Sequence, residues 1–321
     1  MRSKLTGYDV GALLYCPANA HGSIVGAIVE QRFPTPYSLA FCLEDTIREN
    51  GVAEAEEKLK QTMDEMYRAS QEKMFSLPQI FIRVRNSEQI LRLMKAFGEA
   101  SRLIRGFILP KFSLENADAY IEAVLRVNEI SKRPVYMMPI YESPSIIDLR
   151  NRYEILYGLK EKLDRIEELV LNIRVGGNDL CHMFGFRRGS GESIHRISPV
   201  ANIFSDILTV YGMDYVISGP VWEYYDGSGW DTGLRKELAD DRLCGFVGKT
   251  VIHPKQIGLV NAAYQVSRKD FEDAKAILSW NPDESSLVSG SHARERMNEY
   301  KTHTNWAART LFLAEAYGVR D

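Results

Sequence analysis

Cysteine is scarce in this sequence, and the few that occur exclude the common metal knuckles and disulfide frameworks. The 321 residues contain 4 cysteines, at positions 16, 42, 181 and 244, and no two of them form a Cys-x-x-Cys pair. Cys16 and Cys42 lie inside apolar runs, where a free cysteine acts as a small hydrophobic residue. Because structural disulfides are rare in the cytosol, this pattern favours a cytoplasmic protein.

Long apolar runs and a strong charge of either sign are also missing. No run reaches the roughly 18 residues that a membrane span needs, and the short run "GALLYC" near the start reads as a first strand rather than a signal peptide. A net charge of −3 gives no electrostatic reason to bind nucleic acid or an anionic membrane. We therefore expect neither a nucleic acid nor a membrane as partner.

Glycine-rich nucleotide loops are absent as well. No GxGxxG follows the first apolar run, which argues against a dinucleotide-binding fold. The stretch "VGGND", residues 175–179, supplies a flexible turn before a predicted helix, but it lacks the Lys-Ser/Thr ending of a phosphate-binding P-loop.

Short apolar runs alternate with longer helical patterns along most of the chain. Continuous apolar strands separated by helices are typical of a parallel sheet that is covered on both faces. Eight such runs within one domain favour a closed (β/α)8 TIM barrel over an open sheet, and we assign the barrel to residues 1–265. The eight runs are residues 11–16, 38–44, 79–85, 106–111, 135–142, 169–175, 215–220 and 246–252.

The remaining residues, 266–321, lie outside this repeat and are predicted to form a C-terminal helical extension. A first helix is expected after Ser267, with Asp270 three positions later as in a capping box, and a second from residue 292 to near the end. The segment "WAARTLFLAEAYGV" offers apolar side chains, among them Trp306 and Leu311. They can pack on the chain's own barrel or on a neighbouring subunit, and we expect a homo-oligomer.

Carboxylates follow several of the predicted strands at the point where each strand ends. Glu44 and Asp45 follow the second run, Glu142 closes the fifth, and Asp179 comes shortly after the sixth. The carboxyl ends of barrel strands carry the active site in this fold, and like charges so close together need a compensating cation. Oxygen ligands without His or Cys suit Mg²⁺, so Glu142 and Asp179 are predicted as its direct ligands. A single acid at a strand end can also simply cap a helix or face water.

Basic side chains recur at the same level of the predicted barrel. Arg83 and Arg85 end the third strand and Lys111 ends the fourth. An arginine there can grip a substrate carboxylate with two hydrogen bonds, and a cation can stabilise a developing enolate oxygen. The alternatives are a salt bridge between Lys111 and the acids, and a solvated strand end for Arg85. Gly177 and Asn178, just before Asp179, are further candidates for substrate binding.

Seven motifs together resemble a known family. "LYCPAN", "FCLEDTI", "IRVRN", "ILPKF", "PIYES", "GGNDL" and "GFVGKTVIHPKQI" occur in the order found in the citrate lyase β-subunit family of C–C bond lyases, which is similar to malyl-CoA lyase. The resemblance covers residues 11–265. It implies a Mg²⁺-dependent TIM barrel, trimeric or hexameric, that cleaves or forms a C–C bond beside a carbonyl, commonly with a CoA thioester as one partner.

The resemblance also implies roles for individual residues. Glu142 and Asp179 match the metal ligands, and Arg83 looks like the arginine that holds the substrate carboxylate, with Arg85 as a rival. Glu44 and Asp45 match an acidic pair that orders water and nearby groups around the metal.

Two regions depart from the family pattern. Where related CoA lyases carry a C-terminal aspartate that enters a neighbouring subunit's site as acid/base, this chain has Glu299. The first loop, "CPANAHG", lacks the usual basic residue, and His21 is the substitute that the sequence offers. The change in the first loop affects the CoA end of the site and leaves the metal end intact, as expected for a divergent branch of the family.

The leading hypothesis is therefore a lyase with Mg²⁺, or Mn²⁺, that acts on a 2-hydroxy carboxylate or its CoA thioester through a keto acid and its enolate. Arg83, Glu44, Asp45, Lys111 and Glu299 are the candidate catalytic residues. One alternative is a catalytically altered barrel that binds a ligand or a partner protein. Another is a Mg²⁺ enolate enzyme that does not use CoA.

Overall fold

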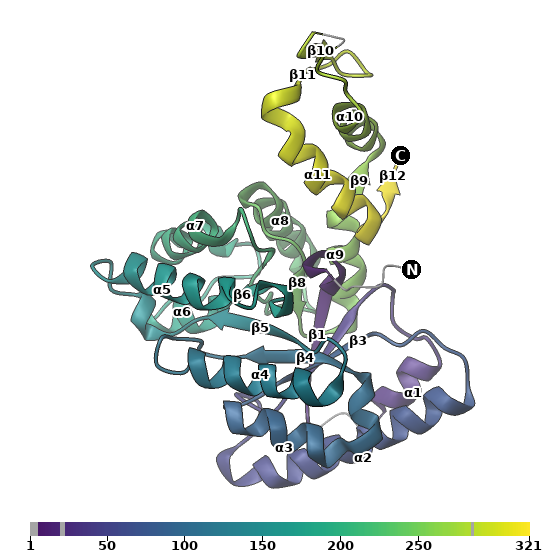
Figure 1. Cartoon of the computed structure of the whole chain (residues 1–321), viewed down its shortest axis with the longest axis vertical. Coiled ribbons are helices and arrows are strands. Elements are labelled where there is room, and N and C mark those ends of the chain that lie inside the picture. The colour runs from purple at the N-terminus through teal and green to yellow at the C-terminus, as the bar shows by residue number, and fades with distance from the viewer. Residues whose placement is uncertain (1–5, 20–22, 284–285) are drawn as a thin grey trace. The chain divides into compact units, whose positions relative to one another are not determined.

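Eight parallel strands form a nearly closed barrel in a computed structural model, which describes residues 6–19, 23–283 and 286–321 (Figure 1). The strand order is β7-β6-β5-β4-β3-β2-β1-β8. Two backbone hydrogen bonds join the outermost strands, from Val247 N–H to the Ile217 carbonyl (2.8 Å) and from Gly219 N–H to the Gly248 carbonyl (3.1 Å). The predicted TIM barrel is confirmed. The strands are β1 (Ala12–Pro17), β2 (Ser38–Cys42), β3 (Gln79–Arg83), β4 (Ile104–Leu109), β5 (Tyr136–Tyr141), β6 (Ile173–Val175), β7 (Ile217–Ser218) and β8 (Lys249–Val251).

Helices follow the strands and lie outside the barrel (Figure 1). Among the residues that the structure describes, no helix is long and apolar enough to cross a membrane. The helices are α1 (Ile24–Val29), α2 (Val52–Glu72), α3 (Ser87–Phe97), α4 (Ala117–Ser131), α5 (Arg152–Asp164), α6 (Gly177–Met183), α7 (Ser198–Tyr211), α8 (Trp230–Cys244) and α9 (Ile257–Tyr264). Short 3-10 turns are η1 (Gly7–Val10), η2 (Glu49–Gly51), η3 (Gly98–Leu103), η4 (Pro144–Ile146), η5 (Glu167–Leu169), η6 (Ile194–Arg196) and η7 (Pro254–Gln256).

Local sequence explains where these elements begin and why the strands are apolar. Every residue of β2 and β5 is buried, because one face packs inside the barrel and the other against helices. Helix α3 begins after Asn86, whose side chain accepts a hydrogen bond from the Gln89 N–H, the capping contact that satisfies a free donor of the first turn.

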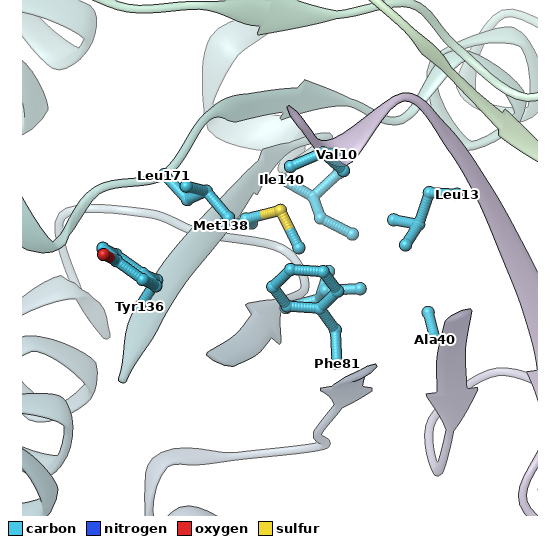
Figure 2. Packing of buried hydrophobic residues seen from close by; sticks show 9 residues of the cluster. Val10, Leu13, Ala40, Phe81, Tyr136, Met138, Ile140 and Leu171 are labelled. Atoms are coloured by element: carbon cyan, nitrogen blue, oxygen red, sulfur yellow. The ribbon is translucent and has the colours of Figure 1, made fainter. Parts of the chain in front are cut away.

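A hydrophobic cluster fills the inside of the barrel (Figure 2). Its side chains come from η1 and β1 to β5 and from the approach to β6, and Figure 2 shows them directed toward one another. Such a filled interior is the packing expected of a TIM barrel, in which the active site lies above the core rather than through it. The members are Val10, Leu13, Ala40, Phe81, Ile108, Tyr136, Met138, Ile140 and Leu171, with Tyr15 packed against them.

A buried ion network joins α8 to β8 on the outside of the sheet. The fully buried ammonium of Lys249 contacts Glu237 (2.9 Å) and Asp241 (2.7 Å), which are also fully buried. Glu237 pairs further with Arg188 (3.1 Å), and Asp241 with His195 (2.8 Å). Burial alone would raise the pKa of Asp241, but the charges of Lys249 and His195 lower it. The buried carboxylate of Asp241 therefore depends on the neighbouring positive charge to remain ionised.

The chain divides into two compact units, Met1–Val260 and Asn261–Asp321. The sequence places the boundary after residue 265, and α9 crosses the observed division. In the second unit Ser267 Oγ accepts a hydrogen bond from Asp270 N–H, the capping contact that the sequence predicts. The further elements are β9 (Val266–Ser267), α10 (Arg268–Leu278), β10 (Val288–Gly290), β11 (Met297–Glu299), α11 (Tyr300–Tyr317) and β12 (Val319–Arg320).

The second unit is less helical than the sequence suggests. The last helix begins at Tyr300 rather than at residue 292, because β10 and β11 pair as an antiparallel hairpin just before it. Helices α10 and α11 meet at a small core of Ala274, Ile277 and Ala307. Trp306 and Leu311, expected to be available for burial, pack against this core.

Candidate active site

A cavity of about 280 Å³ lies at the carboxyl ends of the barrel strands. Ile140, a member of the hydrophobic cluster of Figure 2, and Tyr15, which packs against that cluster, both line the cavity. The top of the core therefore forms the cavity floor. The lining residues are Tyr15, Asp45, Thr46, Arg83, Ile140, Glu142, Arg174, Val175, Gly176, Gly177, Asn178, Asp179, Val221, Thr250 and Ile252.

Two carboxylates, Glu142 and Asp179, meet in this cavity. Glu142 directly follows β5 and is 3% exposed, and Asp179 lies in the first turn of α6. Burial, together with the charge and hydrogen bond of Asp179, raises the pKa of Glu142 to about 8 against the lowering effect of the Arg83 charge. In the metal-free protein Glu142 is therefore largely protonated at pH 7. A second cation beside this pair would remove that cost.

Arg83 lies at the centre of the acidic group, at the end of β3. Its Nη2 is 2.8 Å from Glu44, 2.9 Å from Asp45 and 3.3 Å from Glu142. A guanidinium with several donors in one plane can hold a substrate carboxylate in the same way. The geometry places Arg83 between the Glu142–Asp179 pair and the Glu44–Asp45 pair.

Lys111 completes the charge balance of Glu44 and Asp45. Its ammonium contacts Glu44 and lies 3.0 Å from Asp45, so the salt bridge considered as an alternative role for Lys111 is present. Burial raises the pKa of Glu44. The pKa of Asp45 falls to about 2, because hydrogen bonds from Glu44 and Lys111 and the positive charges of Arg83 and Lys111 outweigh the effect of its burial. Arg83 and Lys111 are thus the compensating cations for this acidic pair.

The backbone of Lys111 also contributes to the site. Its φ is 50°, in the left-handed region that non-glycine residues rarely adopt. In this conformation its N–H donates to Glu142 Oε1 over 3.1 Å. Backbone strain of this kind is often found at functional sites, and here it accompanies a contact that holds Glu142 in place.

Other candidates from the sequence lie in different surroundings. The Arg85 side chain donates to the carbonyls of Leu43, Glu44 and Ile47 and pairs with Glu49, so it fastens the loop after β2 and does not line the cavity. Gly177 and Asn178 do line the cavity. Glu299 belongs to the second unit, where its side chain accepts a hydrogen bond from the Thr302 hydroxyl. His21 falls outside the described residues.

Three polar residues that reach the cavity from the strands themselves were not singled out from the sequence. Tyr15, Arg174 and Thr250 come from β1, β6 and β8. The one available signal was Arg174, a charged residue inside the apolar run "LVLNIRV", because charged side chains are almost never fully buried without a partner. Tyr15 and Thr250 could not be recognised in this way, because tyrosine and threonine are ordinary residues of β-strands.

Gly176 is required for space rather than for flexibility. Its φ of −90° and ψ of 75° lie outside the left-handed region, but a Cβ added there would lie 2.0 Å from Glu142 Oε2 and 2.4 Å from Glu142 Cβ. The turn "VGGND", expected to be a flexible one, therefore lets β6 approach the Glu142 side chain closely.

Substituting this glycine should disturb the acid pair. We expect Gly176→Ala to displace Glu142 and to weaken Mg²⁺ binding by at least about 10-fold, as misplaced metal-site groups commonly do. Titration calorimetry with Mg²⁺ measures this. Gly258→Ala, where no atom lies within 4 Å of the added Cβ, is the matched control and should bind as the wild type does. Unchanged binding by Gly176→Ala would show that Glu142 is not a ligand.

Comparison with known proteins agrees with the barrel fold. Residues 4–319 match the family described as C-C_Bond_Lyase of the TIM-Barrel fold. The match spans nearly the whole sequence, and the chain belongs to this family of C–C bond lyases. No curated protein sequence matches the chain.

Solved structures share the fold at low sequence identity. A citrate lyase from Burkholderia xenovorans LB400 superposes with a TM-score of 0.71 at 14% identity, covering 97% of this chain and 93% of that one. Protein CitE from Mycobacterium tuberculosis, in complex with magnesium, acetoacetate and coenzyme A, superposes with a TM-score of 0.61 at 18% identity, covering 96% and 99%. RipC from Yersinia pestis gives 0.53 at 16% identity, covering 80% and 95%.

Proposed function

We propose that this chain is a Mg²⁺-dependent lyase that cleaves or forms a C–C bond in a 2-hydroxy carboxylate or its CoA thioester. The observation that carries the proposal is the Glu142–Asp179 pair. Two carboxylates meet in a largely buried position beside Arg83, and the pKa of Glu142 rises to about 8 in the absence of a further cation.

The donor set fits a small hard cation. The chain offers oxygen atoms from Glu142 and Asp179, and Mg²⁺ is commonly held by one or two carboxylates while keeping several waters. Among the described residues, no group of three or more His, Cys, Asp or Glu side chains is arranged to hold a metal ion. Mn²⁺ accepts the same ligands. When bound, the ion would polarise a substrate carbonyl and favour negative charge on its oxygen.

The chain's other residues supply binding and charge balance. Arg83 would hold the substrate carboxylate, since its guanidinium lies within 3.3 Å of Glu142 in the cavity wall. Glu44, Asp45 and Lys111 would fix the position of Arg83 through their ion pairs. Gly177 and Asn178 would contact the substrate from the start of α6. Glu299, brought from a neighbouring subunit of a homotrimer or hexamer, would move the proton.

Complexes of the structural relatives support the choice of ligands. The Mycobacterium tuberculosis protein CitE has been solved with magnesium, acetoacetate and coenzyme A, and a citrate lyase β-subunit from the same organism with oxaloacetate and magnesium. A CoA thioester as one substrate is part of the proposal on the same grounds. A cytoplasmic location is part of the proposal because the cysteines form no Cys-x-x-Cys pair or disulfide framework.

A substrate panel tests the proposal. Purified protein with Mg²⁺ is incubated with 2-hydroxy acids and their CoA thioesters, and released keto acid is detected as its hydrazone. Cleavage that is lost with a chelator and restored by Mg²⁺ is the expected result. Cleavage of free acids alone would favour a CoA-independent enzyme. No cleavage and no Mg²⁺-linked keto-acid binding would contradict the proposal and favour a binding protein.

A further inference from the structure

A second cavity lies between two outer helices of the barrel. It is formed by α3, the 3-10 turn η3 and α4, and its volume of about 630 Å³ is within the ~300–1,000 Å³ typical of small-molecule sites. Among the described residues, it shares no lining residue with the active-site cavity. Because η3 leads into β4 and the segment after α4 leads into β5, this α3–α4 cavity lies at the amino ends of the strands, whereas the active site lies at their carboxyl ends.

The walls of the α3–α4 cavity are apolar. Leu91 and Met94 lie one helical turn apart on α3, and Val127 and Ile130 lie one turn apart on α4, where the two helices pack side by side (Figure 1). Ile130 is 66% exposed and Leu91 36% exposed. Contiguous apolar surface with a polar rim is typical of ligand-binding grooves, and a ligand here would remove that surface from water.

Positive charge is concentrated around the same cavity. Four of its lining residues are cations and one is a carboxylate, although the whole chain carries a net charge of −3. Burial lowers the pKa of Arg133, and the charges of Arg105 and Arg102 lower it further, so the cations stand close enough to repel one another. An anion in the cavity would relieve this repulsion. The charged lining residues are Lys95, Arg102, Arg126, Arg133 and Glu99.

Arg133 is fixed in place by the backbone. Its guanidinium donates to the carbonyls of Ser101 (2.6 Å) and Ile104 (2.8 Å), in the segment that leads from η3 into β4. Lys95 approaches the cavity from the last turn of α3, where it is exposed. The cavity therefore has one cation in a fixed position and one on a flexible side chain at its rim.

Arg102 and Arg126 pair with exposed carboxylates three residues away in the chain, Glu99 (2.9 Å) and Glu129 (2.7 Å). The two arginine side chains are 66% and 63% exposed. Exposed ion pairs of this kind contribute little to stability, so an incoming anion can replace either carboxylate at small cost.

We propose that the α3–α4 cavity is a second ligand site, which binds a small organic anion with an apolar chain, such as an acyl chain that ends in a carboxylate. The apolar wall would hold the chain, and the arginines at the rim would hold the charged group through charge-assisted hydrogen bonds. This site is separate from the proposed lyase reaction, so its occupation requires neither the substrate nor Mg²⁺.

Calorimetric titration with simple amphiphiles tests this site. Decanoate, octanoate and neutral 1-octanol are titrated into wild-type protein without Mg²⁺, below the concentrations at which they form micelles. We expect octanoate to bind at least about 10-fold more tightly than octanol, as a hydrogen bond to a charged group would give. Decanoate should bind about 10-fold more tightly than octanoate, because two further CH₂ groups are buried. No binding of decanoate, or equal affinity for octanoate and octanol, overturns the proposal.

Three variants locate the binding. Lys95→Gln combined with Arg126→Gln should weaken octanoate binding at least about 10-fold and leave octanol binding unchanged. Lys58→Gln combined with Arg68→Gln removes two exposed cations of α2 that do not line the cavity, and this matched control should bind as the wild type does. Ile130→Ser should reduce the preference for decanoate over octanoate. Equal losses in the two double variants, or no loss in the first, would place the fatty acid elsewhere and overturn the proposal.

Discussion

Glu142→Gln and Asp179→Asn should each lower turnover by at least about 100-fold, a loss typical of removing a group that stabilises charge in the transition state. Each substitution keeps the shape of the side chain and removes one of the two carboxylates that the chain offers to the metal. Glu142 is largely protonated in the metal-free protein, because burial raises its pKa to about 8. Glu142→Gln should therefore leave the metal-free fold intact.

Turnover measurements test the loss of activity, and circular dichroism and thermal unfolding with and without Mg²⁺ test whether the fold and the metal binding are retained. A ligand that binds only the folded state raises the unfolding temperature, so wild-type protein should be stabilised by Mg²⁺ and both variants should not. Glu154→Gln, an exposed carboxylate on α5, is the control and should behave as the wild type. Retained Mg²⁺-dependent turnover in either site variant would contradict the assignment of the ligands.

Lys249→Met should give the largest loss of stability in the barrel. Its ammonium is fully buried between Glu237 and Asp241, and removing one partner of such a network leaves buried charge uncompensated, which costs about 3–5 kcal/mol. Arg188 and His195 still contact these acids, so a value near the lower end is expected. Urea unfolding gives the free energy.

Two comparisons separate charge from packing at this position. Lys255→Met breaks an exposed pair with Asp226 and should change stability little, as surface ion pairs usually do. Adding Asp241→Asn to Lys249→Met removes one stranded charge and should recover part of the loss. If the double variant is no more stable than Lys249→Met, a stranded charge on Asp241 is not the source of the loss.

The sequence alone was sufficient for the barrel and for the acids at its strand ends. Runs such as 38–44 and 135–142 contain β2 and β5, because strands buried on both faces are continuously apolar. Once the strands are placed, the carboxylates that follow them must gather at one end of the barrel. Glu142 and Asp179 were found in this way, and the structure brings them together in one cavity.

Side-chain contacts between residues far apart in the chain could not be predicted from the sequence. Arg83 and Arg85 are equivalent in the sequence, yet Arg83 meets three carboxylates and Arg85 fastens a loop. The pairing of Arg174 with Thr250 joins residues 76 positions apart. The sequence predicts a flexible turn at Gly176, whereas in the structure its lack of a Cβ makes room for the Glu142 side chain. Each of these depends on side-chain positions that one unaligned sequence does not encode locally.

Calorimetric titration of metal-free wild-type protein with a keto acid, in the presence and absence of Mg²⁺, tests the central claim most directly. The account predicts that a keto acid binds only when Mg²⁺ is present and that this binding is lost in Glu142→Gln. Binding that is the same with and without Mg²⁺, or that survives Glu142→Gln, would contradict it and leave the Glu142–Asp179 pair with a structural role.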